Sequence, residues 1–158
     1  MERDLAAVKA RYPKARYDGI SDGARDLVPW LQKHTGALVL DFYHATGYLA
    51  GAAAAMVSGG PGHKKRAAQW LTRACHDLKH GDGAAARLCA EMKARPALTA
   101  LSDACAEQLQ KAVTYFSHNL GRMDYAARVR EHRPIGSGVT EAACGLIIKD
   151  RMCGRGMR

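Results

Sequence analysis

The sequence predicts an α/β fold that is mainly α-helical, and three observations lead to that prediction. Apolar residues make up 47% of the 158 residues but aromatic residues only 6%, a balance that favours packed helices over a β-sandwich. Two strand-like segments flank a helix-like segment near the N-terminus, which is the α/β order. From residue 43 onward, the apolar residues recur with the helical period. A chain of this length is expected to form one domain.

The N-terminal segment carries the predicted strands. It begins with a helical turn that breaks at Pro13, and a short strand or loop then ends at Asp22. A helix is predicted around residues 27–31. The clearest strand is the continuous apolar run Ala37–Leu40, which is consistent with burial on both faces and ends at Asp41.

After Asp41 the sequence predicts helices only, up to the closing segment. Apolar residues at i, i+3, i+4 and i+7 predict these helices, and glycine or proline marks where several of them end. The predicted helices span residues 43–57, 64–80, 84–94, 97–118 and 122–131. Together they form a helical bundle between the small α/β start and the closing segment "PIGSGVTEAAC".

The chain is strongly basic. Its 24 Lys and Arg residues against 15 Asp and Glu residues give a formal net charge of +9. An excess of positive charge favours polyanionic partners, because each phosphate that Lys or Arg neutralises releases a condensed counterion. Nucleic acid is therefore the leading candidate partner.

The cysteine pattern and the apolar segments indicate a cytoplasmic protein. The five cysteines include no C-x-x-C pair and are interpreted as reduced core residues. The chain opens without a charged-then-apolar leader, and its longest apolar stretch, around "YLAGAAAAMV", is too short to span a bilayer. No membrane partner is expected.

Three carboxylates share a local context that suits metal binding. Asp22, Asp41 and Glu141 each lie at the end of a predicted strand or at a glycine turn. Carboxylates held in this way suit hard divalent cations such as Mg²⁺, and two such ions can activate an attacking oxygen in phosphodiester chemistry. On the residues alone a structural alternative stays open, because Asp-Gly is a common turn signal and Glu in a first helical turn favours the macrodipole.

Four longer motifs occur in a fixed order along the chain. They are "SDGARDLVPWL", "LVLDFYHATGYLAGAA", "NLGRMDY" and "PIGSGVTEAACGLIIKDRMCGRGMR". Together they resemble the C-terminal part of insertion-sequence transposases of the ISKra type, from about Tyr17 to the last residue. These transposases form a DDE group with a ribonuclease-H-like catalytic fold. The resemblance therefore implies DNA strand cleavage and strand transfer, with Mg²⁺ or Mn²⁺ as the cofactor.

The resemblance also implies roles for four residues. Asp22, in the S-D-G-A motif, corresponds to the second metal-binding acid, and Glu141, in P-I-G-S-G-V-T-E, to the third. Asp41 and His44 form the D-x-x-H signature, either as a pair that supports the metal site or fold, or as a polar pair at a helix start. The ribonuclease-H-like parts would span residues 17–45 and 133–158, and the helical insertion residues 46–132.

Departures from the family's pattern lead us to expect a truncated catalytic domain over residues 1–158. The first catalytic Asp of such enzymes lies on a strand well upstream of the S-D-G-A motif, and there is no room for it before Asp22. The family's Lys after "EAAC" is Gly145 here, and the Ser of its "SGMRW" ending is Arg155. We therefore expect a fragment that binds metal poorly and is inactive alone.

Two basic clusters are candidates for DNA contact. Four cationic residues follow Glu141, where a DNA backbone approaching the metals would pass, namely Lys149, Arg151, Arg155 and Arg158. The other cluster, residues 64–66 at the start of a predicted helix, either contacts phosphate or forms a solvated face.

Two further hypotheses compete with the transposase interpretation. The first is a non-enzymatic, basic helical protein that binds DNA or partner chains, with a homo-oligomer among the possibilities; the missing first acid favours it. The second is a zinc hydrolase, because "HDLKH" imitates H-E-x-x-H and puts His76 and His80 on one helix face. The shorter acid and the lack of a marked third ligand argue against zinc.

Overall fold

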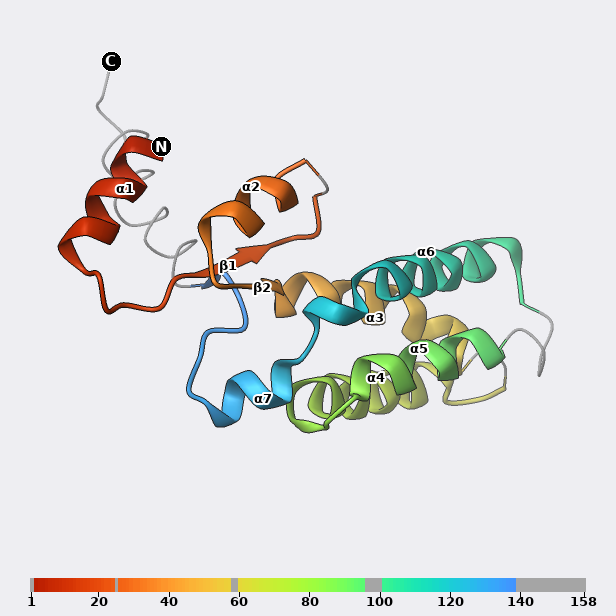
Figure 1. Ribbon diagram of the computed structural model, residues 1–158. Coiled ribbons are helices and arrows are strands. Elements are labelled where there is room, and N and C mark those ends of the chain that lie inside the picture. The colour runs from red at the N-terminus through yellow and green to blue at the C-terminus, as the bar shows by residue number, and fades with distance from the viewer. Residues whose placement is uncertain (1, 25, 58–59, 96–100, 139–158) are drawn as a thin grey trace, which may run out of the picture.

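The computed structural model describes residues 2–24, 26–57, 60–95 and 101–138 (Figure 1). Over these ranges the chain is mainly helical and contains a two-stranded parallel sheet. The predicted class, mainly α-helical with a small α/β part, is confirmed. Outside the described residues lie the proposed third acid and the basic cluster beyond it, that is, Glu141, Lys149, Arg151, Arg155 and Arg158.

The sheet lies in the N-terminal part of the chain. Its elements are α1 (Glu2–Arg11), β1 (Asp18–Ser21), α2 (Val28–His34) and β2 (Ala37–Leu40). The two strands pair in parallel, with Asp18 opposite Ala37 and Ser21 opposite Leu40. β2 has the bounds that its apolar run predicts, and its last two residues are buried against the helices.

The rest of the described chain is a helical bundle. It comprises α3 (Phe42–Met56), α4 (His63–His80), α5 (Ala84–Ala94), α6 (Asp103–Asn119), a 3-10 turn (Leu120–Arg122) and α7 (Tyr125–Arg130). Figure 1 shows α6 lying along α3, and α3 also packs on α4. The alanines that α3 turns inward, Ala45, Ala52 and Ala55, are completely buried, and such small side chains let neighbouring helices approach closely.

One hydrophobic core joins the sheet to the bundle. Val39 and Leu40 of β2 belong to the same buried cluster as Phe116 of α6. At the sheet end of the bundle, Phe42 meets the completely buried Tyr125 edge to face, with ring centroids 5.2 Å apart. The strand ends are therefore fixed against the helices rather than exposed at a loose edge.

Two predicted helices begin at different residues from those expected. Residues 101 and 102 are not helical, and α6 starts only after Ser102, whose hydroxyl accepts a bond from the Cys105 N–H. The predicted helix 122–131 is interrupted, because Asp124 caps α7 by accepting from the Ala127 N–H. In both cases a capping side chain satisfies an N–H group at the helix start and sets where the helix begins.

The segment after α7 lies against the sheet and is attached to it by a buried ion pair. The Asp18 carboxylate, with 9% of its side chain exposed, accepts bonds from Arg133 at 2.7 and 3.1 Å and from Arg128 at 3.3 Å. Next to it, the Phe42 N–H donates to the Ile135 carbonyl at 2.9 Å. These contacts hold residues 133–138 against the start of β1 and the end of β2.

The cysteines and the helix lengths bear on two further expectations. Of the cysteines in the described ranges, Cys89 is buried, Cys75 and Cys105 are partly buried, and all three are free thiols. Across the same ranges, no helix combines the length and the apolar character that crossing a membrane requires.

Candidate functional site

The candidate site lies where the two parallel strands end. Ser21 and Leu40 are paired, so the residues that follow them, Asp22 and Asp41, leave the sheet at the same edge. Between them is a hollow of about 290 Å³, lined by Ile20, Ser21, Asp22, Asp41, Tyr43, His44 and Ser137. The parallel pairing thus brings together three of the residues that the sequence singled out, Asp22, Asp41 and His44.

Asp41 is a buried and fully engaged carboxylate. Only 5% of the residue is exposed, and its Oδ1 accepts a bond from the His44 N–H at 3.1 Å. Its Oδ2 accepts from the Ser137 N–H at 2.7 Å and from the Ser137 hydroxyl. Burial by itself would raise the pKa of Asp41, but the hydrogen bonds from Ser137, His44 and Tyr43 outweigh it and lower the pKa. Asp41 is therefore ionised at neutral pH, and its hydrogen bonds clamp Ser137 to the start of α3.

The clamp holds the turn that precedes the proposed third acid. Ser137 is 96 residues from Asp41 in sequence and lies between Gly136 and Gly138. A Cβ at Gly136 would lie 2.9 Å from the Tyr43 ring, so a side chain at this position would force the ring to shift. The described chain ends at Gly138, beside the strand ends and three residues before Glu141.

Asp22 differs from Asp41 because its side chain is exposed. Its Oδ1 accepts from the Ala24 N–H at 2.9 Å, which closes a tight turn, and Gly23 adopts a φ of 100° that favours glycine. From the other side, the Tyr115 hydroxyl donates to the Asp22 carbonyl at 2.8 Å. The backbone is thus held on two sides while the carboxylate stays accessible.

The relation between Asp41 and His44 is a helix N-cap. The Asp41 side chain accepts from the His44 backbone N–H at the start of α3, while the imidazole is exposed. The ring centroid of His44 lies 6.2 Å from that of Tyr48 and 6.3 Å from that of Tyr115. Of the two interpretations of the D-x-x-H signature, the geometry supports the polar pair at a helix start.

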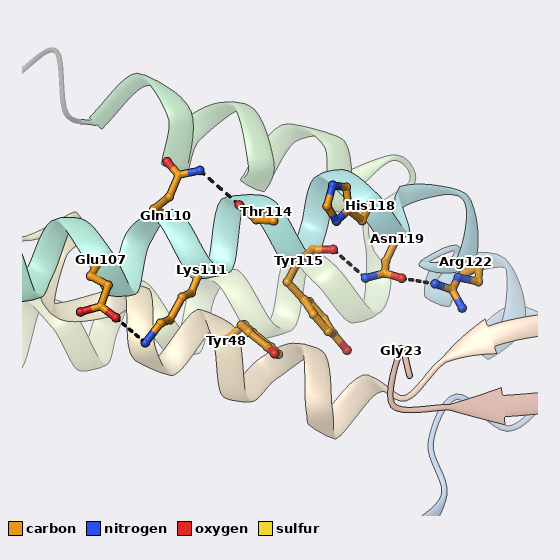
Figure 2. Close-up of a pocket in the computed structure, with 10 residues that line it drawn as sticks. All are labelled: Gly23, Tyr48, Glu107, Gln110, Lys111, Thr114, Tyr115, His118, Asn119 and Arg122. Carbon is orange, nitrogen blue, oxygen red and sulfur yellow. Dashed lines mark hydrogen bonds and ion pairs between the residues drawn. The ribbon is translucent and has the colours of Figure 1, made fainter. Parts of the chain in front are cut away.

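Sequence reasoning missed the tyrosines beside the site. Figure 2 shows Tyr48 of α3 and Tyr115 of α6 side by side, and their rings stack with centroids 3.8 Å apart and an interplanar angle of 14°. Burial, with a smaller effect from Tyr48, raises the pKa of Tyr115, so its hydroxyl stays protonated and can donate to Asp22. No local motif signals such a contact, because Tyr115 and Asp22 are 93 residues apart.

A larger groove continues from these tyrosines along α6. It has a volume of about 850 Å³ and runs between Gly23 and the exposed face of α6, where Figure 2 shows Gln110, Lys111 and Thr114. At the end near Gly23 is Arg122, which donates to the Asn119 side chain and has a buried Nη1 with no partner among the described residues (Figure 2). The groove is lined by polar and cationic groups as well as aromatic rings.

The donor atoms of the smaller hollow suit a hard cation chemically. Asp22 offers an accessible carboxylate, and the Ser21 hydroxyl is buried beside it without a partner among the described residues. Asp41 adds negative charge, although both of its oxygens already accept hydrogen bonds. Within the described ranges no group of three His, Cys, Asp or Glu side chains is close enough to hold a metal.

The histidines of "HDLKH" do share a helix face. The rings of His76 and His80 lie 5.0 Å apart at the end of α4. Asp77 between them pairs with Arg73 at 3.8 Å, and its Oδ1 lies 3.7 Å from His76 Nδ1. No third ligand accompanies the pair in the part of the chain that the structure describes.

Of the two basic clusters, the one at the start of α4 lies within the described residues. Lys64, Lys65 and Arg66 are exposed at the start of α4, and Arg66 donates to the Pro61 carbonyl at 2.6 Å, which caps the loop before the helix. The cluster beyond Glu141 lies outside the described residues.

Comparisons of the chain with protein-family models, with curated proteins and with solved structures found no match.

Proposed function

We propose that the chain belongs to the catalytic domain of a DDE-type transposase, with Asp22 and Glu141 as metal-binding acids. One observation carries the proposal. The parallel pairing of β1 and β2 and the clamp from Asp41 to Ser137 bring the S-D-G-A motif and the start of the P-I-G-S-G motif to one sheet edge. A metal-dependent nuclease or transposase needs acids from distant segments at one point, and strand ends provide such a point.

The length of the intervening chain supports Glu141 as the partner of Asp22. Glu141 is three positions after Gly138, and a chain spans at most about 3.6 Å per residue. Three such steps span at most about 11 Å. The distance is short enough for a Glu side chain to reach the same hollow as Asp22.

Each residue has a distinct role in the proposal. Asp22 and Glu141 would supply oxygen ligands to Mg²⁺ or Mn²⁺, and Asp41 positions the turn that precedes Glu141 without itself being a ligand. When bound, the metal would supply charge stabilisation at the phosphodiester and lower the pKa of the attacking water. The basic cluster beyond Glu141 would neutralise backbone phosphates, as proposed for Lys149, Arg151, Arg155 and Arg158.

Metal binding tests the proposal directly. Because two of three acids should bind metal weakly, Mn²⁺ is titrated in large excess into the chain and its Asp22→Asn and Glu141→Gln variants, with bound metal followed by electron paramagnetic resonance. Asp26→Asn is the matched control, because Asp26 is also exposed and lies in the same loop. We expect Asp22→Asn and Glu141→Gln to weaken Mn²⁺ binding at least about tenfold, as loss of a carboxylate ligand does, while Asp26→Asn has no effect. Equal binding by all variants would refute the assignment.

A second candidate is a non-enzymatic, basic DNA-binding protein. The full engagement of Asp41 in structural hydrogen bonds and the net charge of +9 favour it. It predicts affinity for duplex DNA that falls steeply with salt and does not change when a chelator removes divalent ions. Chelator-sensitive binding that is lost in Asp22→Asn would instead favour the transposase.

A further inference from the structure

A second hollow lies between α3 and α6, next to the strand-end site. This Gly47 trough has a volume of about 380 Å³ and is lined by Tyr43, Gly47, Tyr48, Gly51, Gln108 and Lys111, with His44 at one end. Tyr43 and His44 also line the hollow that contains Asp22, and Tyr48 and Lys111 also line the larger groove along α6. The trough therefore shares lining residues with each of the other two hollows and lies next to both of them.

Of the two glycines on the floor of the trough, Gly47 has no packing explanation. Gly47 and Gly51 lie one turn apart inside α3, where glycine is less favourable than alanine. A Cβ at Gly47 would have no neighbour within 4 Å among the described residues, and one at Gly51 would touch only the flexible Gln108 side chain, at 3.3 Å. Keeping both positions free of side chains leaves α3 less stable but the trough open, as an approaching ligand requires.

The walls of the trough offer aromatic faces. Tyr43 at the start of α3 is 69% exposed, which is unusual for so large a ring, and it lies against the Gly136 turn. Five residues further along α3, the partly buried Tyr48 stacks on Tyr115 with one face and lines the trough. Exposed aromatic rings in a groove are the platforms on which unpaired bases stack, largely irrespective of base identity.

Cationic groups stand beside the rings. Lys111 pairs with Glu107 at 2.7 Å, but both side chains are more than half exposed, at 54% and 64%, so the pair is weak and its ammonium remains open to a phosphate. Arg122 lines the neighbouring groove along α6, although its Nη1 is buried. A cation beside aromatic rings suits a phosphate backbone with its bases turned inward.

We propose that the Gly47 trough binds an unpaired nucleic-acid strand, with a base against Tyr43 or Tyr48 and a phosphate at Lys111. Bases that remain paired and stacked in a duplex do not present a free face to such rings. The inference rests on the proposed function for its substrate, and it adds that the strand reaching Asp22 is single-stranded. It also assigns a binding role to the helical bundle.

The experiment measures binding of a fluorescent oligothymidylate of about 12 nucleotides to the chain in a chelator at low salt. Gly47→Ala is compared with Gly121→Ala, a matched control because a Cβ at Gly121 also meets nothing within 4 Å and the residue is outside the trough. We expect Gly47→Ala to raise Tm, because alanine favours the helix, and to weaken binding several-fold. Gly121→Ala should bind as the parent does.

A second pair of variants keeps the result independent of helix stability. Tyr43→Ala removes the exposed ring and should weaken binding about tenfold, whereas Tyr43→Phe keeps the ring and should bind normally. The inference is overturned if Gly47→Ala and Tyr43→Ala both bind like the parent chain, or if a duplex of the same length binds as tightly as the single strand. Because no metal is present, these outcomes are separate from those of the Mn²⁺ titration, and either proposal can fail alone.

Discussion

The Tyr115 hydroxyl donates a 2.8 Å hydrogen bond to the backbone carbonyl of Asp22, across 93 residues of sequence. It is the contact by which α6 of the bundle holds the loop that follows β1. The ring is fixed in turn by its stack with Tyr48 on α3. The position of the proposed metal-binding acid therefore depends on the helical bundle as well as on the sheet.

Removing that hydroxyl should have a small and measurable effect on stability. Tyr115→Phe keeps the stack on Tyr48 but loses the bond to Asp22, so we expect the free energy of unfolding in urea to fall by about 1 kcal/mol. The same variant should bind Mn²⁺ more weakly, because the loop that carries Asp22 becomes less ordered. Tyr12→Phe, at an exposed tyrosine, is the control and should change neither quantity.

Asp41 should matter more for stability than its sequence suggests. Asp41→Ala removes the cap of α3 and the acceptor for both donors of Ser137, so we expect a loss of about 2–4 kcal/mol in the free energy of unfolding. Ser137→Ala removes the hydroxyl donor alone and should cost about 1–2 kcal/mol. A loss from Asp41→Ala no larger than that from Ser137→Ala would contradict the view of Asp41 as a double clamp.

The buried pair between Asp18 and Arg133 should be costly to break. Arg133→Met leaves the Asp18 carboxylate with Arg128 as its remaining cationic partner, and we expect the free energy of unfolding in urea to fall. The variant should also raise proteolysis after residue 130, because residues 133–138 lose their main attachment to the sheet. Unchanged urea unfolding and unchanged proteolysis would show that the Phe42–Ile135 bond and the Asp41 clamp suffice.

Both buried carboxylates predict a loss of stability in acid. Hydrogen bonds from Arg133 lower the pKa of Asp18, and those from Ser137 outweigh burial and lower that of Asp41. Their contribution is fully present above the unfolded Asp pKa of about 3.9 and is lost as the pH falls through the lower folded values. Urea midpoints measured between about pH 6 and pH 2 should therefore decline below about pH 4, and less steeply in Asp41→Asn.

Much of the secondary structure follows from local sequence. The apolar run Ala37–Leu40 and the periodic segment Ala84–Ala94 form a strand and a helix with the predicted bounds. Each depends on a pattern of neighbouring side chains, which a sequence shows directly. The starts of α6 and α7 were predicted wrongly. Each helix begins after a single capping residue, Ser102 or Asp124, and not where the apolar period begins.

The candidate site was only partly predictable. The sequence singled out Asp22, Asp41 and His44, and the structure brings them around one hollow. Whether Glu141 joins them is a prediction that the described residues do not reach. The sequence did not show that Asp22 is exposed and Asp41 buried, because both residues simply follow a strand.

The sequence by itself determined the elements, the basic charge and the positions of the acids along the chain. Only the tertiary structure decided that the Asp22 carboxylate is accessible while the Asp41 carboxylate accepts hydrogen bonds from Ser137. It also decided that the Tyr115 hydroxyl supports the loop of Asp22. The physical reason is that helices and strands arise from interactions a few residues apart. The burial of a side chain and its hydrogen-bond partners depend instead on contacts between segments that are about 100 residues apart in the chain.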